Sequence, residues 1–393
     1  MWECYGYTEN ENELDWDDIT RQFSFVCDMK GVKQDPIFHA EGDVWTHTHM
    51  VVKQIITHPD FLSFDLQTRH VLFAAGIFHD VEKRSTTSEE YNPELNRIQI
   101  ISPNHAKRGE FTAREILYRE LDCPFDVREK ICKIVRHHGF PIFALEKSDP
   151  QKEVIFTSLY DINHLLTFFA ECDMRGRICP DVDEQLFRIA MFKELCLENN
   201  CWDKPFEFTS DLARFVYFQK EDSSPSYTPF NDLKMTVHLM CGIPASGKDY
   251  VLNNDLKGLP DISLDDIRKE LGFKAGQGSG QAVQEAKERA KQFLRVGQDF
   301  IWNGTNITKL TRSQLIDLFT SYKKHPAKVV IHYVESQSDK QIYQNKNRKS
   351  TVPSKIIDKF VKNLEMPHLS EAHEIQYHLN YAKTKTPQEA QNN

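Results

Sequence analysis

In the first half of the chain, apolar residues recur at intervals of three and four, the spacing of one face of an α-helix. Val51, Val52 and Ile55 lie on such a face within residues 44–58. Further stretches of this kind are 68–79, 105–121, 125–138, 153–175 and 183–199. Because strand signals are scarce here, we predict an all-α domain over residues 14–218.

The pattern changes after a polar stretch with two prolines at 219–232, which is typical of a linker. Short apolar runs then alternate with helical stretches, which predicts a parallel sheet with right-handed crossovers. The predicted strands are 235–241, 260–264, 298–303 and 327–334. The fold class is therefore multidomain, with an all-α domain followed by an α/β domain over 233–393.

Composition agrees with two domains, because 393 residues exceed what one hydrophobic core usually supports. No apolar run of about 18 residues and no signal peptide are present, so we expect a cytoplasmic protein without a membrane partner. Nine cysteines without a CxxC pair indicate reduced thiols. The net charge of -9 argues against sequence-independent coating of DNA, which needs many phosphate contacts.

A phosphate-binding loop is predicted where Gly242-x4-Gly247-Lys248 follows a strand and precedes a helix. Backbone N–H groups of this loop, including that of Ser246, would surround the phosphates of ATP or another NTP with Mg²⁺, and Lys248 would add a cation. Asp249 stands where Ser or Thr usually holds Mg²⁺. A carboxylate can bind Mg²⁺ but also brings negative charge near the phosphates.

Other polar residues follow the predicted strands, at the edge of the sheet where ligands bind. Asp265 could be a general base or could cap a helix. Asn306 follows the third strand, and Arg348 lies in a basic segment between two helices, either as a lid residue or at a solvated helix end.

These segments resemble, in this order, the kinase domain of phage-type polynucleotide 5′-kinases over about 233–380. The resemblance implies that Asp265 takes the proton of a 5′-OH, Arg268 and Asn306 contact the nucleic acid, and Arg348 clamps the donor phosphates. Gln344 departs from the family, since the lid often has an arginine there.

A metal site is predicted from histidines and aspartates of the first half. His79-Asp80 ends a helix, and residues of other helices could complete a mixed nitrogen and oxygen shell, which suits Mn, Fe, Co, Ni or Zn. Such an ion generates hydroxide near neutral pH. Between the adjacent His137 and His138, we choose His138. The candidate ligands are His47, His79, Asp80, His105, His138 and Asp173.

Residues 20–200 resemble the HD phosphohydrolase superfamily, in particular the HD domains attached to tRNA nucleotidyltransferases. The segments that carry this resemblance are Phe38–Thr48, Asn104-His105 and Cys172–Arg177. It implies metal binding by His47, His79, Asp80 and Asp173. It assigns His105 and His138 to a second metal or to the scissile phosphate. Arg175 and Arg177 would hold phosphate or serve the helix end.

Together the two halves resemble the bifunctional bacterial end-healing family HD-Pnk. This implies NTP-dependent phosphorylation of 5′-OH ends of RNA or DNA, and removal of 2′,3′-cyclic, 2′- or 3′-phosphate from the opposite ends. A nucleic-acid ligase would be a fitting partner. Two alternatives stay open: a nucleotidase fused to a small-molecule kinase, and an NTP-sensing domain that regulates an HD hydrolase.

Overall fold

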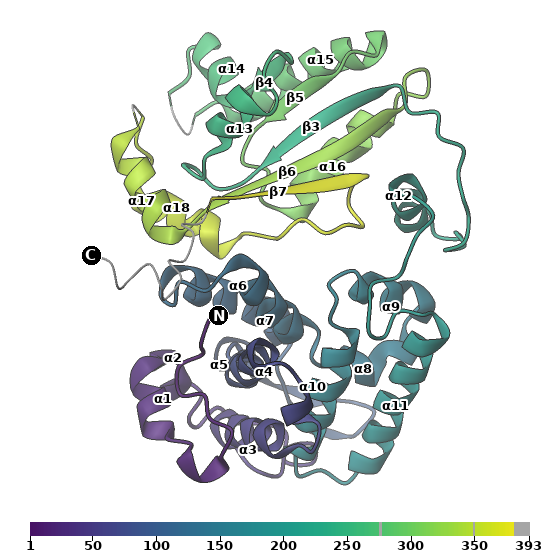
Figure 1. Ribbon diagram of the computed structural model, residues 1–393. Helices are drawn as coiled ribbons and strands as arrows, with labels where there is room; N and C mark the ends of the chain where they lie inside the picture. Colours follow the sequence, from purple (N-terminus) through teal and green to yellow (C-terminus); the bar gives the residue numbers. More distant parts are fainter. Residues whose placement is uncertain (275–276, 349, 381–393) are drawn as a thin grey trace, which may run out of the picture. The chain divides into compact units, whose positions relative to one another are not determined.

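The computed structural model describes residues 1–274, 277–348 and 350–380, and the chain divides into two compact units, Met1–Glu207 and Phe208–Asn393 (Figure 1). Residues 381–393, the end of the predicted second domain, lie outside the described part. No helix within the described residues is long and apolar enough to cross a membrane.

The first unit is built mainly from helices. Its central helix is α4, in which every residue from His70 to Phe78 is buried, and α3, α7 and α10 contact it. The helices are α1 Trp16–Gln22, α2 Ser24–Cys27, α3 Val44–Thr57, α4 Leu66–Phe78, α5 Lys83–Thr86, α6 His105–Arg119, α7 Phe125–His137, α8 Phe140–Phe143, α9 Pro150–Ser158, α10 Asn163–Arg175 and α11 Val182–Glu198.

Side-chain caps fix where several of these helices begin. Asp43 and Asp65 accept hydrogen bonds from the backbone N–H groups of Thr46 and Thr68, at the starts of α3 and α4. Such a cap satisfies a backbone donor that the first helical turn leaves open. The predicted stretch 153–175 is two helices, α9 and α10, because the chain turns between them and Asp161 has a φ of 57°.

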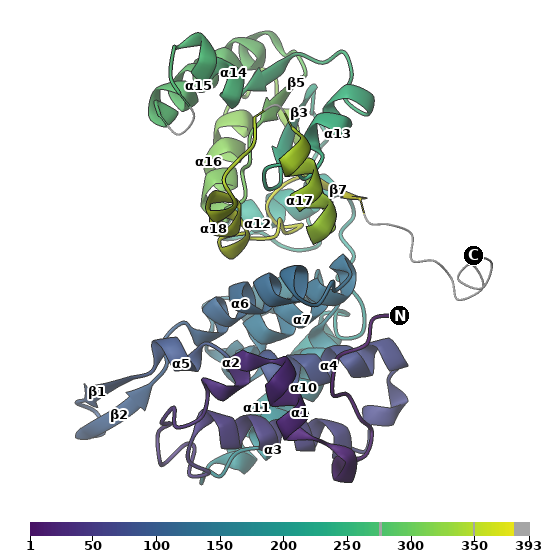
Figure 2. The same ribbon diagram turned by 90° about the vertical axis from the view of Figure 1, so that its left-hand side faces the viewer.

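The all-α prediction for this unit is wrong in one place. Strands β1 Ser88–Asn92 and β2 Arg97–Ile101 form an antiparallel hairpin, which extends away from the helices in Figure 2. Isoleucine alternates with polar residues in β2, which is a strand signal that the sequence-based prediction did not use. At its base, the hydroxyls of Thr87 and Ser102 lie 2.8 Å apart, so the hairpin starts and ends at one place.

The second unit contains a parallel sheet, as predicted, with the strand order β4-β5-β3-β6-β7 within the described residues. The strands are β3 Met235–Cys241, β4 Asp261–Ser263, β5 Phe300–Asn303, β6 Ala327–Ser336 and β7 Glu374–Asn380, the last of which was not predicted. The helices are α12 Asp211–Gln219, α13 Lys248–Asn254, α14 Leu264–Glu270, α15 Ser279–Val296, α16 Lys309–Thr320, α17 Ser338–Asn347 and α18 Ser354–Lys362.

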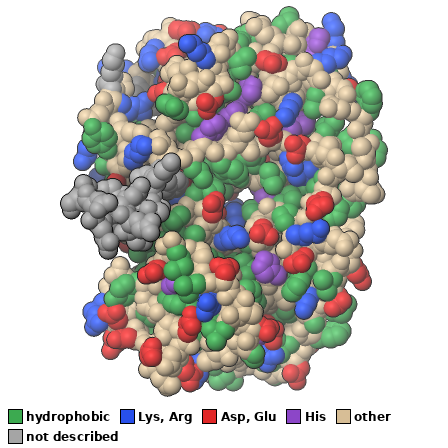
Figure 3. Space-filling view, in the orientation of Figure 1, with side chains coloured by type: hydrophobic (Ala, Val, Ile, Leu, Met, Phe, Trp, Pro, Cys, Tyr) green, Lys and Arg blue, Asp and Glu red, His purple; other side chains and the backbone are tan. Residues whose placement is uncertain are grey.

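Histidines connect three neighbouring strands of this sheet. His238 Nδ1 lies 2.9 Å from His332 Nε2, and His332 Nδ1 lies 3.0 Å from His378 Nε2. Figure 3 shows histidine side chains gathered over the central strands. Burial lowers the pKa of His332 to about 3 and also lowers the pKa of His238 and of His378, which favours an uncharged row that links β3, β6 and β7 without repulsion.

The boundary between the units precedes the predicted linker. Helix α12 was assigned to the first domain, but it belongs to the second unit. Arg214 donates hydrogen bonds to Leu369 O at 3.0 Å and to His373 O at 2.7 Å, and the ring of Phe215 stacks on His373 at 4.0 Å. These contacts with a distant part of the sequence could not be read from local composition.

We predict that Arg214→Ala destabilises the second unit by about 3 kcal/mol, because two charge-assisted hydrogen bonds are lost. Urea unfolding of the full chain labelled with 5-fluorotryptophan measures this, since Trp302 reports on the second unit. As a control, Arg188→Ala removes pairs with Glu146 and Glu184 in the first unit and should leave the Trp302 transition in place. An unchanged transition for Arg214→Ala would contradict the assignment of α12.

Candidate metal centre and phosphate-binding loop

Four of the predicted metal ligands meet at the centre of the first unit. Helix α3 carries His47, the end of α4 leads into His79 and Asp80, and α10 carries Asp173. His47 Nε2 lies 3.0 Å from Asp173 Oδ1 and 3.6 Å from Asp80 Oδ2, while His79 Nε2 lies 3.3 Å from Asp80 Oδ2. All four residues are at most 1% exposed. Side chains far apart in the sequence thus converge on one buried point.

The other two predicted histidines lie on the opposite oxygen of Asp80. His105 Nε2 is 3.4 Å and His138 Nε2 is 3.9 Å from Asp80 Oδ1, and the two Nε2 atoms are 3.4 Å apart. His137 instead lies beside aromatic rings, including that of Tyr160 at 5.8 Å. Asp80 therefore lies between two groups of histidines, and each group with Asp80 has the spacing that could hold a metal ion.

The outer nitrogens of these histidines are held by backbone carbonyls, which leaves Nε2 directed at the carboxylates. Metal-bound histidines usually have such an outer hydrogen bond, because it fixes the Nδ1–H tautomer. The acceptors are Gly176 O for His47 at 3.2 Å, Gly76 O for His79 at 2.8 Å, Ser102 O for His105 at 2.7 Å and Val135 O for His138 at 2.8 Å.

The ionised carboxylates of the cluster suit a divalent cation. Burial alone would raise the pKa of Asp80, but the charges of Lys83 and His79 outweigh it and hold this pKa well below its usual range. Arg177 and His47 do the same for the pKa of Asp173 against its burial. Burial lowers the pKa of His138 to about 3, whereas the pKa of His47 is raised, because its bonds to Asp173 and Glu41 outweigh its burial. Ionised carboxylates and neutral imidazoles are the forms that bind metal.

Buried atoms that make no hydrogen bond also fit a cation at this point. The Nε2 atoms of His47 and His79 and both carboxylate oxygens of Asp80 have no hydrogen-bond partner of suitable geometry within the described residues. Buried polar atoms are seldom left unpaired, and a metal ion is one explanation for a group of them. The residues present therefore fit a site for one or two divalent ions.

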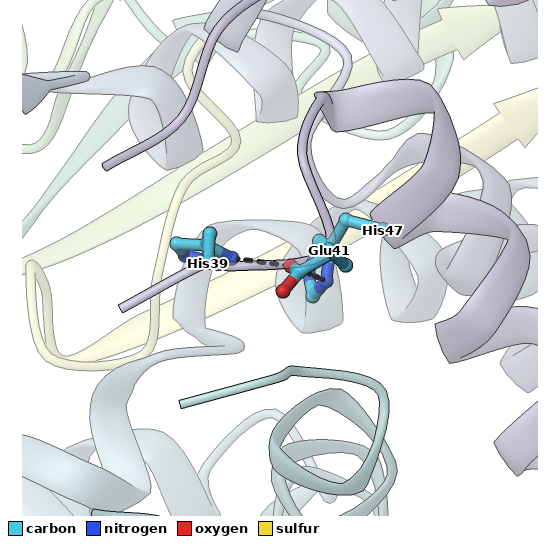
Figure 4. A group of neighbouring side chains, drawn as sticks. All are labelled: His39, Glu41 and His47. Atoms are coloured by element: carbon cyan, nitrogen blue, oxygen red, sulfur yellow. Dashed lines mark hydrogen bonds and ion pairs between the residues drawn. The ribbon is translucent and has the colours of Figure 1, made fainter. Parts of the chain in front are cut away.

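Sequence reasoning missed three residues around this cluster. Lys83 Nζ lies 2.7 Å from Asp80 Oδ2, and its position one helical turn after Asp80 was an available signal. Glu41 Oε1 lies 2.7 Å from His39 Nδ1 and 3.1 Å from His47 Nδ1 (Figure 4). Glu41 and His39 belong to the loop before α3, where no periodicity points to them, although both lie in the segment Phe38–Thr48 that carries the resemblance.

The two arginines after Asp173 have different surroundings. Arg177 binds both oxygens of Asp173, at 3.2 and 2.5 Å, whereas Arg175 pairs with the more exposed Glu171. Arg177 thus balances a buried charge of the cluster, and Arg175 lies outside it.

In the second unit, the loop between β3 and α13 has a backbone that only glycine allows at two points. Gly242 has a φ of 151°, and a Cβ there would lie 2.4 Å from Val334 O. Gly247 has a φ of 103° and immediately precedes α13. Lys248 Nζ donates to Gly242 O and Ile243 O, at 2.8 Å each. The lysine therefore lies over its own loop, where a phosphate would bind.

Charged residues predicted to act with the loop lie around Lys248. Burial lowers the pKa of Lys248 to about 8, while Asp249 and Asp265 raise it and Arg348 lowers it. Asp249 is exposed in the first turn of α13, and Arg348 follows α17. Gln344, the departure in the lid, accepts from Ser336 Oγ at 3.4 Å. The charges of Asp265 and Arg348, which are far apart in sequence, therefore both shift the pKa of Lys248.

Asp265 is not the cap of α14. Ser263 fills that position and accepts from the backbone N–H of Asp266, so the capping interpretation is wrong. The Asp265 side chain is 72% exposed, and its Oδ1 lies 2.5 Å from Arg268 Nη1. This arrangement leaves the carboxylate accessible and places a cation beside it.

Asn306 differs from its predicted contact with nucleic acid. It is 5% exposed, with a φ of 44°, and its amide donates to Met240 O at 2.7 Å. Arg312 Nη1 donates to Asn306 O at 3.2 Å. The side chain thus holds the loop after β5 against β3, and it is a structural residue of the site.

Residues 237–367 match a sequence family described as an AAA domain. This span contains the loop from Gly242 to Lys248, most of β3, and β4, β5 and β6, whereas β7 lies beyond it. The second unit is a P-loop α/β domain. No curated protein matches the chain. Among solved structures, one similar chain is a candidate kinase from Chloroflexus aurantiacus, 18% identical, covering 38% of this chain and 87% of that one, with a TM-score of 0.30.

We predict that NTP affinity falls about fivefold between pH 8 and pH 9, because the triphosphate needs the charged form of Lys248, whose pKa is about 8. Below pH 8 the ammonium is retained and affinity levels off. Isothermal titration calorimetry at several pH values measures this. Lys248→Met should weaken binding and remove the pH dependence, while Lys257→Met, a change of an exposed lysine in the same unit, should alter neither. A pH dependence that survives in Lys248→Met would contradict this assignment.

Proposed function

We propose that this protein is a bifunctional end-healing enzyme of the HD-Pnk type, with RNA or DNA ends as substrates. The observation that carries the proposal is that one chain combines a buried cluster of histidines and aspartates with a P-loop. The first fits removal of phosphate and the second fits its transfer from NTP. Opposite reactions on phosphate make sense for a substrate with two different ends.

In the first unit, His47, His79, Asp80 and Asp173 would hold one transition-metal ion. His105 and His138, on the other oxygen of Asp80, would hold a second ion or the scissile phosphate. A bound Mn, Fe, Co, Ni or Zn ion would supply hydroxide near neutral pH and neutralise charge on the phosphate. The substrate of this HD-type site would be a 2′,3′-cyclic, 2′- or 3′-phosphate.

In the second unit, the loop N–H groups and Lys248 would bind the phosphates of ATP or another NTP with Mg²⁺, which Asp249 could help to hold. Asp265 would accept the proton of the 5′-OH while the oxygen of that hydroxyl attacks the γ-phosphorus and NDP leaves. Arg348 would neutralise charge on the transferred group, and Arg268 would hold a phosphate of the acceptor.

The exposure of Asp265 favours a polynucleotide acceptor over an enclosed small molecule. A side chain that is 72% exposed can be reached by the end of a long chain. The products would be 5′-phosphate and 3′-OH ends, which a nucleic-acid ligase can join.

The test uses an oligonucleotide with a 5′-OH and a 2′,3′-cyclic phosphate, incubated with ATP, Mg²⁺ and in turn Mn²⁺, Co²⁺ or Ni²⁺. We expect phosphate to appear at the 5′ end and to leave the other end. Lys248→Ala should abolish only the first reaction and Asp80→Ala only the second. Processing of free nucleotides alone would instead identify a nucleotidase fused to a small-molecule kinase. Loss of phosphatase activity in Lys248→Ala, with no kinase activity in the parent, would identify an NTP sensor.

Asp265→Asn is expected to lower the kinase kcat by about 10²–10⁴, because the amide cannot accept the hydroxyl proton. Steady-state kinetics with a 5′-OH oligonucleotide measures this, and the KM for ATP should stay close to that of the parent. Asp266→Asn is the matched control, since Asp266 pairs with the exposed Lys269. Equal kcat values for the two variants would remove Asp265 from the reaction.

A further inference from the structure

The loop before α3 places a carboxylate behind the metal cluster. The side chain of Glu41 is fully buried, and its Oε1 lies between two histidines, 2.7 Å from His39 Nδ1 and 3.1 Å from His47 Nδ1 (Figure 4). His47 Nε2 faces Asp80 and Asp173 on the other side of the same ring. Glu41 thus touches His47 on its outer edge and contributes no atom to the inner group.

The second oxygen of Glu41 is bound to the segment that follows α10. Oε2 accepts the backbone N–H of Ile178 at 2.9 Å, and the N–H of Ala40 donates to Ile178 O at 2.8 Å. Beside this contact α3 and the end of α10 approach closely, since a Cβ on Gly176 would lie 2.8 Å from Val51 Cγ2. One carboxylate therefore joins the helix that carries His47 to the end of the helix that carries Asp173.

His47 differs from the other three histidines of the cluster in this respect. The outer nitrogens of those three are bound to backbone carbonyls, whereas Nδ1 of His47 lies near both Gly176 O, at 3.2 Å, and Glu41 Oε1. An ionised carboxylate is the stronger acceptor of the two. Donation from His47 Nδ1 to this carboxylate would fix the tautomer that leaves the lone pair on Nε2, and would make that nitrogen a better metal ligand.

We propose that Glu41 is a positioning residue of the metal centre, which orients His47 and strengthens its bond to the ion, while His39 holds Glu41 in place. This inference rests on the proposed metal site of the first unit. Removing the charge of Glu41 should weaken metal binding about 10–100-fold, which is the usual effect of changing an outer partner. The P-loop reaction should not change.

Cobalt provides a test that does not depend on activity. Co²⁺ is titrated into metal-free full-length protein, with affinity measured by competition against a chromophoric chelator and geometry by the visible absorption of the bound ion. The variants are Glu41→Gln, which keeps size but removes charge, and Glu41→Asp, which keeps charge. The matched control is Glu171→Gln, since Glu171 also faces a histidine, His58, at 3.8 Å but lies outside the cluster.

We expect Glu41→Gln to bind Co²⁺ 10–100-fold more weakly with an altered spectrum. Glu41→Asp should lie between it and the parent, and Glu171→Gln should equal the parent. Parent-like affinity and spectrum in Glu41→Gln would overturn the inference while leaving the metal site in place. Absence of Co²⁺ binding in the parent would overturn both.

Thermal unfolding of each metal-free variant, monitored by circular dichroism, distinguishes weaker metal binding from misfolding. If Glu41→Gln does not fold, Co²⁺ binding is measured with His39→Gln instead, because this substitution loosens Glu41 without removing the charge of its carboxylate. A parent-like affinity and spectrum in a folded His39→Gln would then overturn the inference.

Discussion

The charge of Asp80 governs the arrangement of the first unit. A carboxylate taken out of water costs several kcal/mol unless its charge is paired. Here Lys83 contacts one oxygen at 2.7 Å, and histidines from α3, α4, α6 and the end of α7 surround both. Asp173 is also a buried carboxylate, and Arg177 pairs its charge through hydrogen bonds to both of its oxygens. Each charge is thus paired by a cation of its own segment, and histidines from helices far apart in sequence complete the surroundings of Asp80.

The two sites suit ligands of opposite charge and use different protein groups to do so. The first unit gathers side chains with net negative charge and lone pairs, which suits a cation. The second unit gathers backbone N–H groups and Lys248, which suits an anion. The ammonium group of Lys248 donates to two carbonyls of its own loop, at 2.8 Å each. Phosphate binding would exchange these neutral acceptors for charged ones.

Motifs with fixed local spacing could be read from the sequence, and features that depend on distant contacts could not. The P-loop was placed correctly because strand, loop and helix are contiguous. The histidines and aspartates of the cluster were chosen by type and resemblance, and the structure brings them together. Asn306 has a side chain suited to a ligand contact, yet it is buried and its amide donates a hydrogen bond to Met240 O. Likewise, local sequence assigns α12 to the first domain, and its contacts with Leu369 and His373 place it in the second unit.

The β1–β2 hairpin lies in the chain between Lys83 and His105, two residues that contact Asp80. Because Ser88 pairs with Ile101 and Thr87 contacts Ser102, the two ends of the hairpin lie side by side at its base. Its length can therefore change by whole strand pairs without moving either end. The tip of the hairpin can diversify through insertion and deletion, while the geometry around Asp80 stays constant.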